Sequence, residues 1–347
     1  MVLRFASFLF QEFAPLLIRF ESWVVVWYDV AMNKKDEFTR KSGMLDVGDG
    51  HKIYWEDWGN PKAPPIMHFH GGPGGSFNDS HKLTFNPEIH RVIFYDQRGS
   101  GKSTPYASTK NNTTQDLIKD AEKLRSHLNL GKIYLIGGSW GSTMALMYAL
   151  TYHNNVKGMV MWGIYLARQF ENDIISAGYG RYTYPEAWER YIDMVPEENR
   201  KDGTSITKYY ADKINSKDEK VAIKYADEWT LWECTLLTLD YDKRKIESET
   251  ILGDNSNLAI ARFETHYFLN GCFIPENHIL ENIEKIKHIP AYVVQGRFDN
   301  CTPPISAYEL SKAYGSNLML QFVNAGHKRH DAQLKASLVT AINTIFK

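Results

Sequence analysis

The sequence predicts an α/β fold with a mostly parallel central sheet, helices on both faces and one helical insertion. Short apolar runs alternate with amphipathic helical stretches over residues 43–166. Over residues 167–287 charged helical stretches rich in Trp and Tyr replace this alternation, which resumes afterwards. Because a sheet that is interrupted and then resumed forms one core, we expect residues 32–166 and 288–347 to form the core and residues 167–287 to form a helical cap.

The individual elements follow from local patterns. A Gly-Asp-Gly turn at residues 48–50 joins two partly alternating runs into an antiparallel hairpin at the sheet edge. Thr113 or Thr114 can cap a helix whose apolar residues fall on one face and which ends before Gly131. The remaining core strands are expected at residues 66–69, 91–95, 134–136, 156–165, 292–295 and 319–323. The remaining core helices are expected at residues 142–152 and 306–314, with a final helix that follows the last strand and ends at residue 346.

Composition restricts the class of protein. A chain of 347 residues with 43% hydrophobic residues can bury a large core without disulfides. The net charge of −1, without runs of Lys and Arg among aromatic residues, argues against nucleic acid or an anionic membrane as partner. The cysteines Cys234, Cys272 and Cys301 are widely spaced and form no Cys-x-x-Cys, so we expect buried thiols in a reducing cytoplasm and no structural metal site.

Residues 1–31 form an N-terminal extension of uncertain status. Charged residues interrupt its apolar stretches, which fall short of the roughly 18–20 apolar residues of a bilayer span. The first apolar stretch is also short for a signal peptide and lacks a cleavage site of small residues. We interpret residues 1–31 as an extension outside the core, with residues 32–35 as an alternative start. Membrane contact through a surface-lying helix stays open but is not favoured.

A Gly-x-Ser-x-Gly sequence at residues 137–141 lies between an apolar run and a helix, as in a nucleophile elbow. Gly137 and Gly141 leave no Cβ to clash in the sharp turn, which exposes the hydroxyl of Ser139. The backbone N–H of Trp140 then provides half of an oxyanion hole, and we select the N–H of Gly72, in the glycine loop after the third strand, as the second donor.

Asp299 and His327 follow the last two predicted strands. In open parallel sheets, active sites form beyond the carboxyl ends of the strands. The chain order Ser139, Asp299, His327 is that of the triad in the α/β-hydrolase fold, which we therefore predict. His327 would act as general base and Asp299 would orient its imidazole. Activity should be lost as His327 protonates, near its reference pKa of about 6.5. A Gly-Lys-Ser sequence at residues 101–103 is not a nucleotide-binding loop, because Asp96 replaces the first glycine of that motif.

These motifs resemble the prolyl aminopeptidases, or proline iminopeptidases, of the α/β-hydrolase superfamily. The resemblance is carried by His-Gly-Gly-Pro-Gly-Gly at residues 70–75, Asp-Gln-Arg-Gly-x-Gly-x-Ser at 96–103 and Gly-Gly-Ser-Trp-Gly at 137–141, with Gly-Arg-Phe-Asp at 296–299 and Ala-Gly-His at 325–327. It runs from about residue 43 to the C-terminus. It implies a serine exopeptidase that removes N-terminal proline from peptides with a free amino end, without a metal or cofactor, and cap glutamates that bind this amino end.

Two glutamates of the predicted cap match that implication. Helical spacing places Glu233 and Glu264 on apolar faces among aromatic residues. An unpaired buried carboxylate either takes up a proton or finds a cation, so two of them in one cleft need a cation between them. The protonated imino nitrogen of an N-terminal proline would serve. The alternative is that each glutamate pairs with an Arg or Lys of the cap.

The resemblance also implies a proline pocket lined by Tyr165 and Phe268. The chain departs from the family pattern at two places. Ile174 and Ile175 stand where further aromatic residues are expected, and Trp162 stands where many members have an arginine. These departures put strict proline specificity in doubt, although they do not affect the requirement for a free amino end.

Two other functions stay open. The first is an esterase or lactonase on the same core, in which Glu233 and Glu264 are only structural. The second is a non-catalytic receptor for a small molecule, against which the presence of all three triad residues argues. Dehalogenases and epoxide hydrolases use an aspartate nucleophile where this chain has Ser139.

Overall fold

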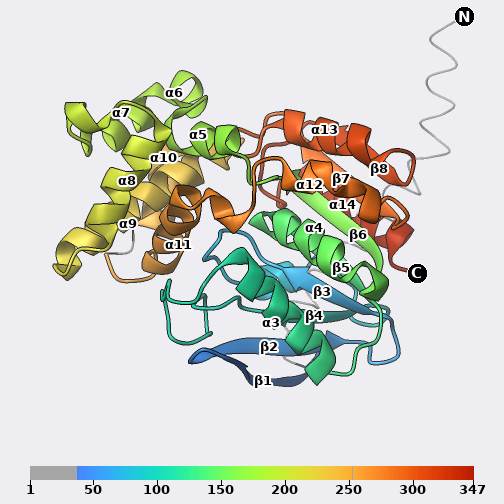
Figure 1. Cartoon of the computed structure of the whole chain (residues 1–347). Coiled ribbons are helices and arrows are strands. Elements are labelled where there is room, and N and C mark those ends of the chain that lie inside the picture. Colours follow the sequence, from blue (N-terminus) through green and yellow to red (C-terminus); the bar gives the residue numbers. More distant parts are fainter. Residues whose placement is uncertain (1–36, 252) are drawn as a thin grey trace, which may run out of the picture.

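The computed structural model describes residues 37–251 and 253–347, so the interpretation of residues 1–31 lies outside the described residues. The described residues form an eight-stranded sheet in the order β1-β2-β4-β3-β5-β6-β7-β8 (Figure 1). β1 pairs antiparallel with β2 and β2 pairs antiparallel with β4, whereas the other neighbours are parallel. The predicted mostly parallel sheet with a hairpin at its edge is confirmed. The strands are β1 (Thr39–Gly48), β2 (His51–Gly59), β3 (Pro65–Phe69), β4 (Arg91–Tyr95), β5 (Ile133–Ser139), β6 (Val156–Ile164), β7 (Ala291–Gly296) and β8 (Leu318–Val323).

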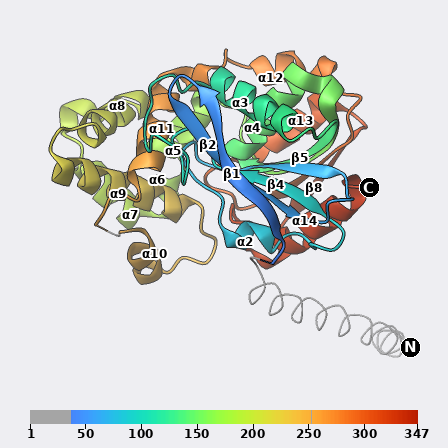
Figure 2. The ribbon, with the colours of Figure 1, turned by 90° about the horizontal axis from the view of Figure 1, so that it is seen from below.

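Helices cover both faces of the sheet (Figure 2). Successive residues of β5 pack into two separate apolar clusters, Leu135 on the side of α3, α4 and α13 and Ile136 on the side of α14. Burial on both faces explains why the parallel strands appear as continuous apolar runs in the sequence. The core helices are α2 (Asp79–Lys82), α3 (Thr114–His127), α4 (Trp140–Tyr152), η1 (His153–Asn155), α13 (Pro304–Tyr314) and α14 (Ala332–Ile345).

The start of α3 shows how local sequence sets an element. Thr113 is the N-cap residue, and its side chain accepts a hydrogen bond from the Asp116 N–H while the Asp116 carboxylate accepts one from the Thr113 N–H. This reciprocal pair satisfies two N–H groups that a helix end leaves free. The predicted stripe of Leu117, Ala121 and Leu124 is buried against the sheet. Of the two predicted cap residues, Thr113 is therefore the one used.

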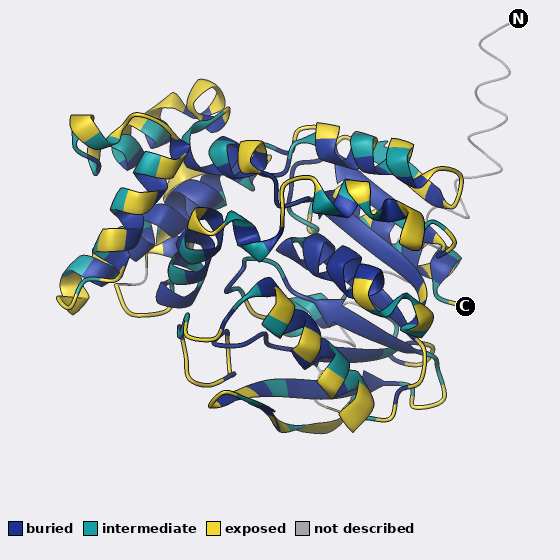
Figure 3. Cartoon of the chain, in the orientation of Figure 1, coloured by how far each residue is buried: buried dark blue, intermediate teal, exposed yellow. Residues whose placement is uncertain are grey.

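Between β6 and β7 the described residues contain helices and turns but no strand, and we call this stretch the helical insertion. Its helices α5 to α11 lie to one side of the sheet in Figure 1, whereas α12 lies beside α4 and α13, and Figure 3 shows that the inner faces of the helices are buried. Its interior is aromatic, with Tyr191 stacked on Tyr210 at 4.7 Å and on Trp232 at 5.3 Å between ring centroids. Its elements are α5 (Gln169–Ala177), α6 (Gly180–Thr183), α7 (Pro185–Asp193), η2 (Glu197–Asn199), α8 (Gly203–Ile214), α9 (Glu219–Leu236), α10 (Lys243–Thr250), α11 (Leu258–Leu269), η3 (Gly271–Phe273), α12 (His278–Glu281) and η4 (Ile283–Lys285).

The insertion packs tightly on the loops at the carboxyl ends of the strands. A Cβ at Gly74, in the loop after β3, would lie 2.6 Å from the carbonyl oxygen of Ala259 on α11. On the other side, a Cβ at Gly326, after β8, would lie 3.2 Å from the Cβ of Leu239 in the α9–α10 connection. Close contacts of this kind position α9 and α11 against the loops at the carboxyl ends of the strands. Within the described part of the chain, no helix has the length and apolar character needed to cross a membrane.

Candidate active site

Ser139 occupies the turn between β5 and α4 with φ 57° and ψ −131°, a strained conformation for a residue with a side chain. The two glycines around it allow the backbone to approach itself closely. A Cβ at Gly137 would lie 2.2 Å from the carbonyl oxygen of Gly141, and a Cβ at Gly141 would lie 2.3 Å from that of Phe69. The sharp turn expected from Gly-x-Ser-x-Gly is therefore present, and it presents Ser139 at the carboxyl end of the sheet.

Asp299 and His327 come from the loops after β7 and β8 and meet there. His327 Nδ1 lies 2.8 Å from Asp299 Oδ2. The Thr302 hydroxyl donates to the same oxygen at 2.9 Å, and the N–H groups of Cys301 and Thr302 donate to Asp299 Oδ1. The Gln295 amide also donates to Oδ2, at 3.2 Å. These donors fix the carboxylate, and through it the tautomer and orientation of the imidazole.

The imidazole of His327 lies beside the elbow. β5 and β6 pair Gly138 with Trp162 and Ser139 with Ile164, so the register shifts at Gly163. A Cβ at Gly163 would lie 2.8 Å from His327 Cε1, so the ring rests on the backbone next to Ser139. Within the described residues Ser139 Oγ and His327 are not hydrogen-bonded, a bond that in hydrolases is often long without substrate and shortens in the complex.

The electrostatics around His327 favour its charged form. Burial acts to lower the pKa of His327, but the negative charge and hydrogen bond of Asp299, and next the charge of Glu233, outweigh it, so the pKa is raised. A group that must be neutral to act as general base therefore protonates at a higher pH than its reference value. We therefore expect the acid limb of the pH–activity profile to lie above pH 6.5, the value expected from the sequence.

The predicted oxyanion loop is tightly coiled against Ser139. Gly72 has φ +117°, and a Cβ on it would lie 2.6 Å from the N atoms of both Gly74 and Gly75. A Cβ on the preceding Gly71 would lie 3.6 Å from Ser139 Cβ. The loop therefore reaches the nucleophile as expected, while the assignment of the Gly72 and Trp140 N–H groups as the two oxyanion donors stays a prediction.

A buried network that the sequence did not reveal holds this loop. His70 Nε2 accepts a hydrogen bond from the Gln97 N–H at 2.9 Å, so Nδ1 carries the proton and donates to the Gly71 carbonyl at 2.8 Å. Burial lowers the pKa of His70 to about 4, which keeps the ring neutral. The Gln97 side-chain oxygen accepts from Trp140 Nε1 at 2.9 Å. The network thus links the two segments that carry the predicted oxyanion donors.

Glu233 on α9 and Glu264 on α11 face each other in the insertion. Their exposed fractions are 6% and 1%, and their side chains share a hydrogen bond. Trp229 Nε1 donates to Glu264 Oε2. Burial raises the pKa of both groups, and the neighbouring Glu233 raises that of Glu264 further, well above its usual range. The hydrogen bond lowers the pKa of Glu233 and raises that of Glu264, as expected when protonated Glu264 donates to Glu233.

Neither carboxylate has a cationic partner among the described residues, so the alternative in which each pairs with an Arg or Lys of the cap is wrong. Glu233 is close enough to His327 for their charges to interact. The structure therefore brings the two predicted glutamates together, with Glu233 near His327.

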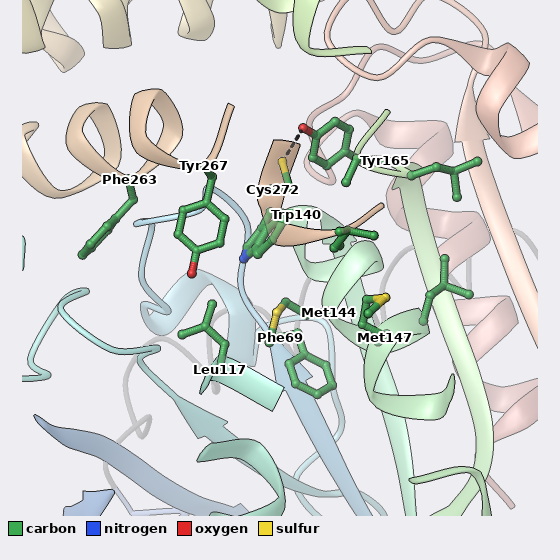
Figure 4. Close-up of a cluster of buried hydrophobic side chains, with 14 of the residues drawn as sticks. Phe69, Leu117, Trp140, Met144, Met147, Tyr165, Phe263, Tyr267 and Cys272 are labelled. Carbon is green, nitrogen blue, oxygen red and sulfur yellow. Dashed lines mark hydrogen bonds between the residues drawn. The ribbon is translucent and has the colours of Figure 1, made fainter. Parts of the chain in front are cut away.

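Several aromatic residues pack near the two glutamates. The rings of Tyr165 and Phe268 are both buried and lie edge to face, with centroids 6.4 Å apart. Trp229 lies 6.2 Å from Phe268, and Trp140 lies 6.4 Å from Tyr165. Figure 4 shows Trp140 near Tyr165, Tyr267 and Cys272, and the contact of the Tyr165 hydroxyl with Cys272 Sγ, which is 3.2 Å long. Tyr165 and Phe268 therefore lie together, while their role as the lining of a proline pocket stays a prediction.

Gln295 and Thr302 were missed by reasoning from the sequence. The Gln295 side chain accepts from the Ile164 N–H at 2.9 Å and donates to Asp299, so it ties β6 to the triad loop. A single amide inside the apolar run of β7 was the available signal. Thr302 follows Asp299 by three residues, a spacing common in turns and therefore uninformative.

In the described part of the chain, no group of three His, Cys, Asp or Glu side chains could hold a metal ion.

Comparison with known proteins identifies the family. A family model described as the alpha/beta hydrolase fold matches residues 64–331. A proline iminopeptidase of Arabidopsis thaliana is 41% identical over 301 residues, which cover 86% of this chain and 78% of the relative. A proline iminopeptidase of Neisseria gonorrhoeae is 42% identical over 307 residues, which cover 88% and 96%. The chain belongs to the proline iminopeptidase family. The resemblance and the α/β-hydrolase fold expected from the sequence are both confirmed.

Solved structures show the same fold at low identity. An esterase from Exiguobacterium antarcticum has a TM-score of 0.58 at 18% identity and covers 88% of this chain and 100% of its own. A proline iminopeptidase from Mycobacterium smegmatis has a TM-score of 0.55 at 15% identity, with coverages of 88% and 98%. At such identities the likeness shows the fold alone.

The departures from the proline iminopeptidase pattern have structural explanations. A Cβ at Gly138 would lie 2.0 Å from the Trp162 ring, which packs in the apolar cluster under α14, on the other side of the sheet from Met161. Ile175 contributes its carbonyl oxygen, which accepts from Trp232 Nε1 at 2.8 Å. Ile174 lines a surface hollow of about 590 Å³ beside α6. Trp162 thus belongs to the core, and Ile175 connects α5 to α9.

Proposed function

We propose that this member of the proline iminopeptidase family is a serine exopeptidase that releases N-terminal proline, or another small residue, from peptides with a free amino end. The observation that carries the proposal is the pair Glu233 and Glu264, buried together beside His327 without a cation among the described residues. A buried pair of acids that shares one proton is a binding site for a cation.

The reaction follows from the geometry around Ser139. The Ser139 hydroxyl attacks the carbonyl carbon of the N-terminal residue while His327 takes its proton, and Asp299 stabilises the imidazolium. The N–H groups of Trp140 and Gly72 bind the oxyanion of the tetrahedral intermediate. His327 then gives the proton to the departing amine. Water, activated by the same imidazole, hydrolyses the acyl-enzyme and restores Ser139.

The glutamate pair determines which peptide bond is cut. The protonated imino nitrogen of an N-terminal proline lies between Glu233 and Glu264, and its pyrrolidine ring packs against Tyr165 and Phe268. Binding of this cation favours the ionised form of Glu264 and releases the shared proton. A peptide that continues beyond its first residue on the amino side would leave both acids without a cation. The enzyme is therefore restricted to the N-terminus.

The organisation of the chain fits this role. We assign residues 32–166 and 288–347 to the hydrolase core and residues 167–287 to a cap that supplies both glutamates and Phe268. Of the described cysteines, all three are free thiols, which supports the cytoplasm as the compartment. The substrate is a peptide, and we assign no cofactor and no nucleic-acid partner.

The glutamate role is tested by comparing two substrates in one variant. E233Q should lower kcat/KM for prolyl p-nitroanilide by about 100-fold or more, because a buried charged pair is lost, and should change kcat/KM for p-nitrophenyl acetate by less than about threefold. E228Q, on the same helix but paired with Arg190, is the matched control and should leave both values near wild type. Equal losses on both substrates would sink the exopeptidase assignment in favour of an esterase. The exopeptidase assignment would also fail if the wild-type enzyme cleaved N-acetylprolyl p-nitroanilide as fast as prolyl p-nitroanilide.

A further inference from the structure

An unpaired guanidinium lies just beyond the catalytic histidine. Arg329, two residues after His327, donates from Nη1 to the Thr84 hydroxyl at 3.0 Å and from Nη2 to the Ser80 hydroxyl at 2.6 Å. Among the described residues no carboxylate forms an ion pair with it. The nearby acids have other partners, since Asp79 pairs with Lys82 at 3.3 Å and Asp331 accepts from the Gly326 N–H at 2.7 Å. A partly buried cation held only by neutral hydroxyls can accept an anionic partner.

The imidazoles packed beside Arg329 are uncharged. Burial lowers its pKa to about 10. The His81 ring packs edge-on against His68 with centroids 4.9 Å apart, and burial, then the charge of Arg329, lowers the pKa of His81 to about 3. His68 is 2% exposed, and its Nδ1 has no hydrogen-bond partner among the described residues. Lys328 and His330 flank Arg329 and add no negative charge.

The guanidinium keeps free donors on its exposed side. A guanidinium has five N–H donors, and Ser80 and Thr84 each take one. Arg329 is partly exposed, and none of its nitrogens is among the buried atoms without a partner. Nε, which has no hydrogen-bond partner among the described residues, is therefore not fully buried. Two hydroxyls thus hold the guanidinium through Nη1 and Nη2, while Nε stays available to an oxygen of a carboxylate.

Arg329 lies close enough to His327 to reach the leaving part of a peptide. The Cα atoms of Arg329 and His327 are at most about 7 Å apart, because two residues of extended chain span no more. His327 protonates the amine of the leaving peptide, and the C-terminal carboxylate of a leaving dipeptide lies about 7 Å beyond that amine. Ser80 and Thr84 follow, along the chain, the loop that contains Gly72. A short substrate can therefore span from the glutamate pair to Arg329.

We propose that Arg329, held by Ser80 and Thr84, binds the C-terminal carboxylate of short peptide substrates, so that the enzyme prefers dipeptides and tripeptides with a free carboxyl end. This proposal rests on the proposed function, because it concerns the leaving part of the same substrate. The glutamate pair then binds the charged amino end of a small peptide, and the guanidinium binds its charged carboxyl end.

The test compares free acids with amides. For Pro-Gly-Gly and Pro-Gly, wild-type kcat/KM should exceed that for the corresponding C-terminal amides by about tenfold, the value of a charge-assisted hydrogen bond. R329Q should remove this preference while leaving kcat/KM for prolyl p-nitroanilide, which has no carboxylate, within about twofold of wild type. S80A should reduce the preference partially. R200Q, which removes a positive charge of the insertion that pairs with Asp193, is the matched control and should keep the preference.

The outcomes separate this subsite from the proposed function. Equal kcat/KM for acids and amides in the wild-type enzyme would overturn the subsite alone, and needs no variant to fold. A preference that persists in R329Q would overturn the role of Arg329. Inorganic phosphate should compete with Pro-Gly-Gly but not with prolyl p-nitroanilide; Arg329-dependent binding of phosphate without any acid preference would show a site for a free inorganic anion and overturn the substrate role. Failure to cleave every prolyl substrate would overturn the exopeptidase function itself.

Discussion

The core and the helical insertion each bury carboxylates beside the same imidazole, but they treat them in opposite ways. Asp299, in the core, accepts hydrogen bonds from the His327 ring, a threonine hydroxyl, an amide and two backbone N–H groups. Glu264, in the insertion, accepts from one indole and otherwise faces a second carboxylate, Glu233. Each environment is dry, so the difference lies in the partners and not in the burial.

This difference separates a fixed part of the site from a part that is completed by ligand. The carboxylate of Asp299 is fully satisfied by the chain, so its charge and direction are set before substrate arrives. The pair Glu233 and Glu264 instead shares a proton at a place where a cation could bind. Burying two acids without a cation lowers the stability of the fold. We therefore expect the core to perform the chemistry on any acyl group placed at Ser139, and the insertion to select which molecule is placed there.

The largest effect should come from the fixed part. D299N keeps the shape and most hydrogen bonds but removes the charge that orients and stabilises the His327 imidazolium, so we expect kcat to fall by about 10⁴-fold. If the core acts independently of the insertion, the loss should be the same for prolyl p-nitroanilide and for p-nitrophenyl acetate. Steady-state kinetics on both substrates measures this. A loss below tenfold, or one confined to the prolyl substrate, would contradict the division between the two regions.

Sequence reasoning recovered the core well and the insertion only in outline. Apolar runs that end in glycine-rich turns predict the succession of strands along the chain, the elbow at Ser139 and the segments that carry Asp299 and His327. They can do so because such turns are encoded by neighbouring residues. The faces of Glu233 and Glu264 were also readable from helical spacing. Their direct hydrogen bond was not, since it depends on how α9 packs against α11. The network of His70, Gln97 and Trp140 likewise joins distant segments through side-chain contacts that leave no periodic signal.

A second prediction concerns the stability cost of the glutamate pair. In the folded protein the pKa of Glu264 is raised by burial and by Glu233, whereas in the unfolded chain it is near 4.5. Between these two values the folded state holds more protons, so the free energy of unfolding falls as the pH rises through that range. E264Q keeps a donor to Glu233 and an acceptor for Trp229 without the charge. We expect it to unfold with a free energy about 1–3 kcal/mol higher than wild type at pH 8.

The measurement is urea unfolding of both proteins at pH 5 and pH 8. The advantage of E264Q should be small at pH 5 and larger at pH 8, while its turnover of prolyl p-nitroanilide is reduced. E228Q again serves as control, because Glu228 pairs with Arg190. If E264Q were less stable than wild type at both pH values, Glu264 would be a structural group whose charge the fold requires, and the contrast with Asp299 would fail.

The smallest predicted effect couples the two regions through charge. Activity requires neutral His327, so it falls as the pH is lowered through the His327 pKa, which Asp299 and then Glu233 raise against the effect of burial. The acid limb of kcat/KM for p-nitrophenyl acetate in the wild-type enzyme should therefore lie above pH 6.5. E233Q removes one negative charge near the imidazole, and we expect the limb to move to lower pH by about half a unit. E228Q should not move it. The ester is the right substrate because it does not use the glutamates for binding. An unchanged limb in E233Q would mean that Glu233 is uncharged in the free enzyme, and that the proton shared by the two acids resides on it.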